Sequence, residues 1–368
     1  MTTAATVLSV NAGSSSVKLR LVGADDEIVE SVDAPFDPAS GDVEGVVGSI
    51  ESMGAADVVA HRVVHGGTRF TNAIQIDADV LAGIAELVPL APIHQPSALA
   101  LIRAVSVARP STPAVACFDT AFHATMPPAN STYAIPERWR VGHGIRRFGF
   151  HGLSHDDASR QACALLGLDL RSARVVTCHL GSGASVCAVL GGVSVDTSMG
   201  FTPLDGLVMA TRSGSVDPGA ILWLVANGVS PADVQNALEH ESGLLGLAGS
   251  ADMRVVLDHA AAGDECSVLA LDVYIHRLRS LIAAMTASMD GIDALVFTGG
   301  VGENSAEVRR RATHGLTHLG IVIDSSRNDD GTGDRDLSAA TARTRVAVVG
   351  AREDRTMARL ARQVTLRR

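Results

Sequence analysis

The sequence contains one short pattern twice, and this repetition restricts the fold more than any other feature. An apolar strand, a turn rich in glycine and serine, and a second strand occupy residues 7–22 and recur at 175–190. Gly181 follows Gly13 by 168 positions. A repeat of this length indicates a duplicated domain, because solenoid repeats have periods of only about 20–50 residues.

Segments with helical periodicity separate the predicted strands. Apolar residues share one face of a predicted helix at 80–88, which Pro89 should end, and of a longer helix at 271–285. Gly291 then provides a helix cap before a predicted strand at 294–297. Strands that alternate with helices in both halves predict mixed α/β layers, and 368 residues suggest two domains.

The C-terminal part of the sequence mixes an irregular segment with regular ones. Residues 324–344 lack periodicity, so we expect an exposed loop or an edge hairpin there. A strand at 346–349 and a polar helix that starts near Glu353 are expected to end the chain.

Charge and composition exclude several classes of protein. There are 40 acidic and 30 basic residues, a net charge of −10, which disfavours non-specific nucleic-acid binding. The longest uncharged stretch, 175–195, contains His179 and several glycines and does not suit a membrane span. The five cysteines form no C-x-x-C pair and no signal peptide is evident, so we expect a reducing, cytoplasmic location without membrane partners.

Several well-known catalytic motifs are absent from the sequence. It has no G-x-x-x-x-G-K-[ST] loop, no G-x-G-x-x-G that opens a helix and no G-x-S-x-G elbow. Two H-x-x-x-H pairs, His61 with His65 and His151 with His155, could in principle bind zinc. Neither pair carries the glutamate of a metalloprotease, and neighbouring glycines should interrupt the helices, so we do not expect a zinc site.

Three glycine-rich turns follow apolar strands, at 11–16, 179–185 and 298–304. Successive free backbone N–H groups in such turns form concave anion sites, and the third turn leads into a predicted helix at 305–312. For any one of these turns alone, a structural hairpin is the better explanation. The three together favour a site for nucleotide phosphates.

Polar groups also stand within apolar or small-residue sequence, where burial without a partner is costly. A core histidine or a structural ion pair explains any single cluster, but five clusters favour a site that binds charge. The clusters are His61–Gly67, Ile93–Pro96, Phe118–His123, Phe150–Gly152 and Thr211–Gly214.

The segments Asn11–Lys18 and His61–Gly67 resemble the two diagnostic signatures of the acetate kinases. Further motifs continue the resemblance in the family's order along nearly the whole chain. The matching segments are Asn11–Lys18, His61–Gly67, Phe118–His123, Gly149–Gly152, Asp196–Pro203, Thr211–Gly214, Gly299–Ser305 and Arg352–Asp354. The resemblance implies an α/β fold of duplicated actin-like (ribonuclease H-like) βββαβαβα domains with a nucleotide cleft between them. It also places the chain in the superfamily of acetate and sugar kinases, heat-shock chaperones and actin.

The resemblance implies a domain division and a reaction. Residues 1–123 with 352–368 would form the domain that holds the acyl substrate and the first phosphate loop. Residues 124–351 would bind the nucleotide and form a homodimer. The implied reaction is reversible transfer of the γ-phosphoryl group of ATP to acetate, which gives acetyl phosphate and ADP and serves acetyl-CoA biosynthesis.

The resemblance also assigns roles to the candidate catalytic residues. Arg62 and Arg212 would neutralise charge on the carboxylate and phosphoryl groups, for which planar guanidinium forks are suited. His151 would donate to the transferring phosphoryl group, and His94 would support it. Asp119 matches the essential carboxylate of the family, and we assign it to magnesium organisation and substrate orientation, because acetate has no proton to lose at pH 7.

The remaining site residues are likewise carried over by the resemblance. Asn11 and Glu353 match magnesium-associated positions, with Mn²⁺ as an alternative ion. Arg62 would also contact the acyl substrate, whose methyl pocket would be formed by Val64, Ile93, Phe150 and Pro203. The nucleotide-binding residues would be Ser14, Ser16, Lys18, His179, Leu180, Gly181, Ser182, Gly183, Asp252, Met253, Arg254, Gly300, Val301, Gly302, Glu303 and Asn304.

Three positions depart from the family pattern, and two alternative functions stay open. Gln95 and Ser182 stand where the family usually has asparagine, and Arg352 replaces the asparagine before Glu353. Propionate kinase is the close alternative, because one methylene changes pocket binding by only about 1–3 kcal/mol. An actin-like or chaperone-like ATPase switch is the remote alternative, since it shares the phosphate loops but needs no converging arginines and histidine.

Overall fold

The structure is a computed structural model that describes residues 5–13, 16–36, 43–92 and 94–366. The chain packs into two compact units. Unit 1 comprises Met1–Ala124, Phe150–Asp157 and Arg352–Arg368, and unit 2 comprises Thr125–Gly149 and Ala158–Ala351. The segment Phe150–Asp157 thus packs with unit 1, although it lies inside the stretch that we expected to belong to the second domain.

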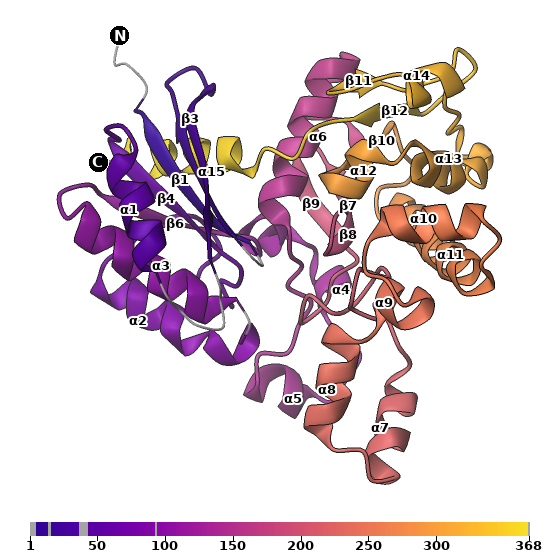
Figure 1. Cartoon of the computed structure of the whole chain (residues 1–368), viewed down its shortest axis with the longest axis horizontal. Coiled ribbons are helices and arrows are strands. Elements are labelled where there is room, and N and C mark those ends of the chain that lie inside the picture. Colours follow the sequence, from indigo (N-terminus) through magenta and orange to yellow (C-terminus); the bar gives the residue numbers. More distant parts are fainter. Residues whose placement is uncertain (1–4, 14–15, 37–42, 93, 367–368) are drawn as a thin grey trace. The chain divides into compact units, whose positions relative to one another are not determined.

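Unit 1 is built on a six-stranded mixed sheet of order β3-β2-β1-β4-β6-β5 (Figure 1). The first three strands are antiparallel neighbours, whereas β1, β4 and β6 run parallel. The strands are β1 (Val7–Ala12), β2 (Ser16–Val22), β3 (Ile28–Pro35), β4 (Val58–Val63), β5 (Ile74–Gln75) and β6 (Ala114–Phe118).

Helices cover both faces of this sheet. On one face, β1–β3 pack against α1 and α3 around Leu8 and Leu101, while β4 and β6 pack against α2 and α3 around Val63 and Ile84. The helices of unit 1 are α1 (Glu44–Ser52), α2 (Ala78–Glu86), η1 (Val88–Leu90), α3 (Gln95–Ala108), η2 (Ala121–Thr125, whose last residue belongs to unit 2) and α15 (Glu353–Thr365).

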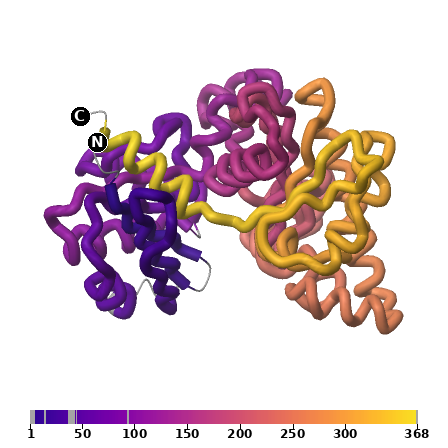
Figure 2. The backbone as a smooth tube through the Cα atoms, turned by 90° about the horizontal axis from the view of Figure 1, so that it is seen from above, coloured from indigo at the N-terminus to yellow at the C-terminus, as the bar shows by residue number. Residues whose placement is uncertain are grey.

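Helix α15 covers the opposite face of the same sheet. Met357, Ala358 and Ala361 are buried against Val7 and Val58, which point away from the α3 side. Figure 2 shows α15, in yellow, running alongside the indigo strands of unit 1, and its contacts with β1 and β4 agree. The helix that we expected to be polar is therefore amphipathic, because one of its faces closes the core.

Unit 2 repeats the architecture of unit 1. Its sheet has the order β11-β12-β10-β7-β8-β9, and β7, β10 and β12 are parallel as β1, β4 and β6 are. The pattern of antiparallel partners is also repeated, so the duplication predicted from the two glycine turns is confirmed. The strands are β7 (Arg174–Leu180), β8 (Ala184–Leu190), β9 (Val193–Thr197), β10 (Ala294–Thr298), β11 (Arg335–Asp336) and β12 (Arg345–Val348).

Helix α11 is the central helix of unit 2 and contacts β7, β8, α9, α10 and α13. Its buried face contains Leu271, Tyr274, Ile275 and Leu278, as its apolar periodicity predicts. With α11 itself (Glu265–Ala287), the helices of this unit include α4 (Pro128–Ser131), α5 (Glu137–Gly142), α7 (Pro218–Ala226), α8 (Pro231–His240), α9 (Gly243–Ala248), α10 (Met253–Ala261), α12 (Gly299–Asn304), α13 (Ala306–His314), η3 (Thr317–Leu319) and α14 (Ser325–Asp329).

Two local expectations need correction, and a third is confirmed only in part. The third glycine turn is itself a short helix, α12, because Gly299 takes a left-handed φ of 79° and the following residues continue as helix. The segment 324–344 contributes the edge strand β11, which pairs antiparallel with β12 as an edge hairpin would, but it also contains the short helix α14, which we did not expect. Gly152 does not prevent a helix but begins one, α6 (Gly152–Leu166), so that His155 is helical.

None of the helices in the described part of the chain is long and apolar enough to cross a membrane. The cysteines Cys117, Cys163, Cys178 and Cys266 are free in the described residues. Burial raises the pKa of the Cys117 thiol to about 12, so this thiol stays protonated and is no nucleophile at neutral pH.

Candidate active site

Three polar side chains lie at the carboxyl ends of the parallel strands of unit 1. Asn11 is on β1, Arg62 is on β4, and Asp119 directly follows β6. Side chains alternate between the two faces of a strand, and these three share the face of Val7 and Val58, which α15 covers. Ligand sites in open α/β sheets form outside the carboxyl ends of parallel strands. The topology therefore brings the three residues together.

Glu353, the first residue of α15, completes this group. Arg62 donates to both carboxylate oxygens of Asp119, with Nε–Oδ1 at 3.0 Å and Nη2–Oδ2 at 2.7 Å. Its Nη1 donates to Asn11 Oδ1 at 3.1 Å and lies 3.8 Å from Glu353 Oε2. The amide of Asn11 donates to the same Glu353 oxygen at 2.7 Å. We call these four residues the Arg62 cluster.

Burial and charge act against each other in the Arg62 cluster. The Asp119 side chain is only 1% exposed and that of Arg62 16%. Burial raises the pKa of the Asp119 carboxyl, and the charge and hydrogen bonds of Arg62 limit this rise. Burial alone would lower the pKa of Arg62, but Asp119 and Glu353 outweigh it and raise this pKa, so the guanidinium is charged.

His151 lies beside this cluster in a left-handed turn. Its φ is 56°, an uncommon conformation for a residue other than glycine. Its backbone N–H donates to the Asp119 carboxylate, and the N–H of Gly152 donates to the Asp119 carbonyl at 3.0 Å. A Cβ at Gly152 would lie 2.1 Å from that carbonyl oxygen, so glycine is required for this approach.

The predicted His94 stands at the start of α3, and its neighbour Gln95 is fully buried. The Gln95 amide donates from Nε2 to the His65 carbonyl at 3.0 Å, and Gln95 Oε1 accepts from the His65 N–H at 3.4 Å. Gln95, which stands where the family usually has asparagine, thus holds both the N–H and the carbonyl of His65. Asparagine would reach one methylene less far.

The acyl-pocket candidates are only partly described. Val64 is half-buried after β4, and Phe150 is 1% exposed with its ring edge-on to His65 at a centroid distance of 5.4 Å. Pro203 belongs to unit 2. Ile93 of this pocket and Ser14 of the first phosphate loop lie outside the described residues.

A hydrogen bond joins the two described ends of the first glycine-rich segment, between β1 and β2. The N–H of Gly13 donates to the Ser16 carbonyl at 2.8 Å. Lys18 is exposed on β2 and pairs with Asn11 across the two strands. Its charge lowers the pKa of Asp354, although burial and then Glu353 raise that pKa overall. Lys18 therefore lies close enough to α15 to act on its first turn.

In unit 2, the predicted nucleotide residues of two loops lie together at the carboxyl ends of β7 and β10. The N–H of Gly181 donates to the Gly183 carbonyl at 3.0 Å, which closes the turn between β7 and β8. A Cβ at Gly299 would lie 2.9 Å from the Leu180 carbonyl oxygen, so α12 begins in direct contact with this strand end. The Ser182 carbonyl accepts from the Ala210 N–H at 3.1 Å, a contact that does not depend on the side chain at 182.

Two of the predicted adenosine-side carboxylates are used within the protein. Glu303 Oε1 accepts from the N–H groups of Gly299 and Ala351, both at 3.0 Å. Asp252 caps α10 and accepts from Arg254 Nε at 3.0 Å. Hydrogen bonds from Arg254 lower the pKa of Asp252 to about 2. Both carboxylates thus stabilise the backbone that we expected to surround the nucleotide.

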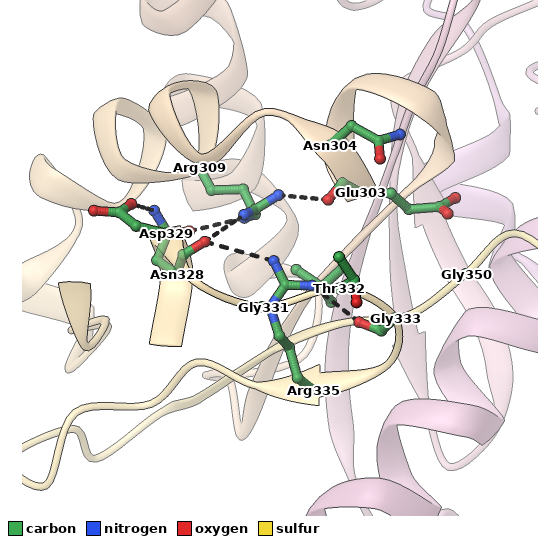
Figure 3. A pocket seen from close by; sticks show the side chains of 11 residues that line it. Glu303, Asn304, Arg309, Asn328, Asp329, Gly331, Thr332, Gly333, Arg335 and Gly350 are labelled. Atoms are coloured by element: carbon green, nitrogen blue, oxygen red, sulfur yellow. Dashed lines mark hydrogen bonds between the residues drawn. The ribbon is translucent and has the colours of Figure 1, made fainter. Parts of the chain in front are cut away.

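A cavity of about 200 Å³ lies beside the end of α12 and the end of β12 (Figure 3). Glu303 and Asn304 line it, together with Gly350 and the loop 329–335. Arg309 also lines the cavity and is only 1% exposed. Its guanidinium donates to the carbonyls of Gly302 and Glu303 at 2.9 and 2.8 Å. The cavity therefore adjoins the predicted nucleotide-binding helix.

Arg212 differs from Arg62 in its surroundings. It donates to the Pro203 carbonyl at 3.2 Å, and no carboxylate lies within ion-pair distance among the described residues. Burial lowers its pKa, and the more distant Glu239 opposes this shift. Unlike Arg62, Arg212 is therefore a largely buried cation whose charge no described carboxylate balances at short range.

Comparison with known proteins identifies the family of the chain. The pattern of the acetokinase family matches residues 44–359. The chain belongs to this family. Acetate kinase from Microcystis aeruginosa is 46% identical over 319 residues, which cover 86% of this chain and 79% of that relative.

Solved structures of family members have the same fold. Acetate kinase from Porphyromonas gingivalis superposes with a TM-score of 0.88 at 35% identity, over 98% of this chain and 99% of that one. A propionate kinase from Francisella tularensis gives the same TM-score, identity and coverage. The duplicated actin-like α/β fold expected from the sequence is confirmed, and the acetokinase relatives class the chain among the kinases.

Sequence reasoning overlooked two residues that hold the site together in this family member. Thr120 Oγ1 accepts from the N–H of Gly66 at 3.0 Å, and His123 contacts the Phe150 carbonyl at 2.9 Å. Both stand in the segment Phe118–His123 that carried the resemblance. The sequence did contain a signal for His123, because it is a histidine within one of the polar clusters that we expected to be buried.

Proposed function

We propose that this acetokinase-family member transfers the γ-phosphoryl group of ATP to acetate, reversibly and with Mg²⁺, forming acetyl phosphate and ADP. The Arg62 cluster carries this proposal, because it gathers a charged guanidinium, two carboxylates and an amide at the carboxyl ends of β1, β4 and β6. The names of the relatives, which are acetate and propionate kinases, support the same reaction.

Phosphoryl transfer requires positioning and charge neutralisation more than covalent chemistry. Arg62 would attract the acetate carboxylate, and its bidentate contact with Asp119 fixes the direction of its fork. Arg212 and His151 would donate to the transferring group, and His94 would support His151. Arg62 and His151 lie in unit 1 and Arg212 in unit 2, and their convergence on one phosphoryl group stays a prediction.

The donor atoms of the Arg62 cluster suit Mg²⁺. Asn11 Oδ1 and the carboxylates of Glu353 and Asp119 are hard oxygen ligands, and the two carboxylates with one guanidinium leave a net negative charge. Mg²⁺ usually binds one or two carboxylates, keeps several waters and completes its shell with phosphates. Asn11 and Glu353 would hold the ion, and Mn²⁺ has the same preference for oxygen. Such an ion neutralises charge on the phosphate oxygens when it is bound.

We assign unit 1 to the acyl substrate and the first phosphate loop, and unit 2 to the nucleotide. Ser16 and Lys18 would contact phosphate from unit 1. In unit 2, the turn 179–183, residues 252–254 and the helix 300–304 would surround ATP, with Glu303 and Asp252 acting through the backbone that they fix. We further propose a cytoplasmic enzyme that feeds acetyl-CoA biosynthesis.

Propionate is the second candidate acceptor. A propionate kinase matches this chain as well as an acetate kinase does, at a TM-score of 0.88 and 35% identity. A pocket that includes Val64 and Phe150 discriminates one methylene by only about 1–3 kcal/mol. We therefore propose acetate as the preferred acceptor and propionate as a slower one.

We propose that the enzyme is a homodimer built through unit 2. Helix α7 supports this, because none of its residues is buried and Leu222 and Trp223 are 70% and 64% exposed. Exposed apolar side chains that follow one another on a helix are typical of an interface. Leu222→Asp with Trp223→Asp should yield a monomer in sedimentation analysis, whereas a wild-type monomer would refute the dimer.

The decisive experiment follows acyl phosphate directly. The protein is incubated with ATP, Mg²⁺, hydroxylamine and either acetate, propionate, butyrate or no acid. We expect hydroxamate in the order acetate, propionate, butyrate, and no ATP consumption without acid. ATP hydrolysis that needs no acid and gives no hydroxamate would support the ATPase switch instead. A variant with Asp119→Asn serves as the inactive control.

A further inference from the structure

The turn that presents His151 is strained and must be held by its surroundings. His151 has a φ of 56°, in the left-handed region that a residue with a Cβ rarely adopts. Such conformations persist only where the neighbouring structure enforces them. The direction of the His151 side chain therefore depends on the contacts of Phe150 and Gly152.

Three hydrogen bonds from one segment hold this turn. The Asp119 carbonyl accepts from the Gly152 N–H at 3.0 Å, and the Asp119 carboxylate accepts from the His151 N–H. The third bond joins His123 Nε2 to the Phe150 carbonyl oxygen at 2.9 Å. Asp119 already belongs to the Arg62 cluster, so His123 is the one of these partners to which no role has been given.

The chemistry of His123 suits a permanent donor. A carbonyl oxygen can only accept, so Nε2 of His123 must carry the proton in this contact. The side chain is fully buried, and burial lowers its pKa to about 4, although the Phe150 carbonyl opposes this shift. The ring therefore stays neutral, in one tautomer, over the whole pH range in which a kinase would work. His155 packs edge-on against it at 5.8 Å and restricts its rotation.

We propose that His123 is a positioning residue, which fixes the Phe150 carbonyl and thereby aims the His151 imidazole at the transferring group. It does not itself touch substrate. The inference rests on the proposed function in so far as it concerns catalysis. A misplacement of about 1 Å in a catalytic group can cost about 100-fold in rate. Loss of the Nε2–H donor should thus act on kcat through His151.

Two variants of His123 separate the effect of its hydrogen-bond donor from the effect of its side-chain volume. His123→Leu fills the site but removes the donor, whereas His123→Gln returns an N–H at similar reach. We expect kcat to fall about 10- to 100-fold in His123→Leu, with the KM for ATP unchanged. His123→Gln should recover most of that loss. A wild-type kcat in His123→Leu would overturn the proposal, as would a His123→Gln variant that folds but is no better than His123→Leu.

A second measurement reports on position without requiring activity. His151 is half-buried and His123 fully buried, so diethyl pyrocarbonate should modify His151 at a measurable rate, followed by peptide mass spectrometry. That rate should change at least twofold in His123→Leu and return in His123→Gln, and equal rates in all three proteins would overturn the positioning role. Absence of hydroxamate from the wild type would refute the proposed function instead, while the modification rates would still decide the role of His123.

Discussion

The close approach of Gly152 to Asp119 makes a sharp prediction for Gly152→Ala. A Cβ at this position would lie 2.1 Å from the Asp119 carbonyl oxygen and 2.8 Å from Phe122 Cβ. Gly152 begins α6 without a left-handed φ, so alanine is excluded by space and not by backbone conformation. Because one contact is with backbone, no side-chain rotation can relieve it, and the two segments must separate.

The size of the effect follows from two contributions. Overpacking in a closed core costs about 1–3 kcal/mol. Separation of the segments also breaks the 3.0 Å bond from the Gly152 N–H and leaves a buried group unsatisfied, which costs about 1–3 kcal/mol more. Together these give a loss of about 2–6 kcal/mol. At about 2–4 °C per kcal/mol for a unit of this size, the melting temperature should fall by roughly 4–24 °C.

Calorimetry and the hydroxamate assay test this prediction together. Gly48→Ala is the matched control, because a Cβ at Gly48 meets nothing within 4 Å in the middle of α1. Alanine there should raise stability by about 0.5–1 kcal/mol and leave hydroxamate formation unchanged. Gly152→Ala should form hydroxamate at least 10-fold more slowly at a temperature where it is folded. Equal melting temperatures for Gly152→Ala and the wild type would refute the steric argument.

Three further predictions concern charged and titratable groups. Arg62→Ala should lower turnover about 10²–10³-fold and, by leaving Asp119 buried without its partner, lower the free energy of unfolding by about 3–5 kcal/mol in urea titrations. Arg212→Ala should lower turnover as much but shift the urea midpoint only slightly, since Arg212 pairs with no carboxylate in the described structure; equal destabilisation by both variants would contradict this difference. Burial lowers the pKa of His61 to about 3, below its unfolded value of about 6.5, so its contribution to stability is complete above pH 6.5 and is lost as the pH falls toward 3. Melting temperatures measured from pH 7 to pH 4 should therefore fall less steeply in His61→Asn than in the wild type.

The sequence allowed the fold to be predicted because the duplication leaves a local signal. Each strand–glycine turn–strand unit has its own hydrophobic pattern, and the two sheets have the same strand order. The hydrophobic pattern of the sequence failed to predict burial where tertiary contacts determine it. The polar composition of α15 concealed the stripe of Met357, Ala358 and Ala361, whose burial depends on a sheet far away in the sequence.

The candidate site could be predicted as a set of residues but not as a geometry. Asn11, Arg62 and Asp119 stand out as polar groups at strand ends, yet only the parallel order of β1, β4 and β6 puts them on one face. From the sequence alone, Arg62 and Arg212 have the same expected role and cannot be distinguished. Their different partners, and hence the expected difference in stability between the two variants, follow from the packing alone.

Lys18 has a practical consequence that goes beyond catalysis. It is the only lysine in the sequence, and its side chain is exposed on β2 opposite Asn11. An amine-reactive fluorophore would therefore label a single side chain of this protein, at the edge of the Arg62 cluster and without any engineered cysteine. Changes in the emission of that dye on addition of ATP would test in real time the proposal that phosphate binds beside Lys18.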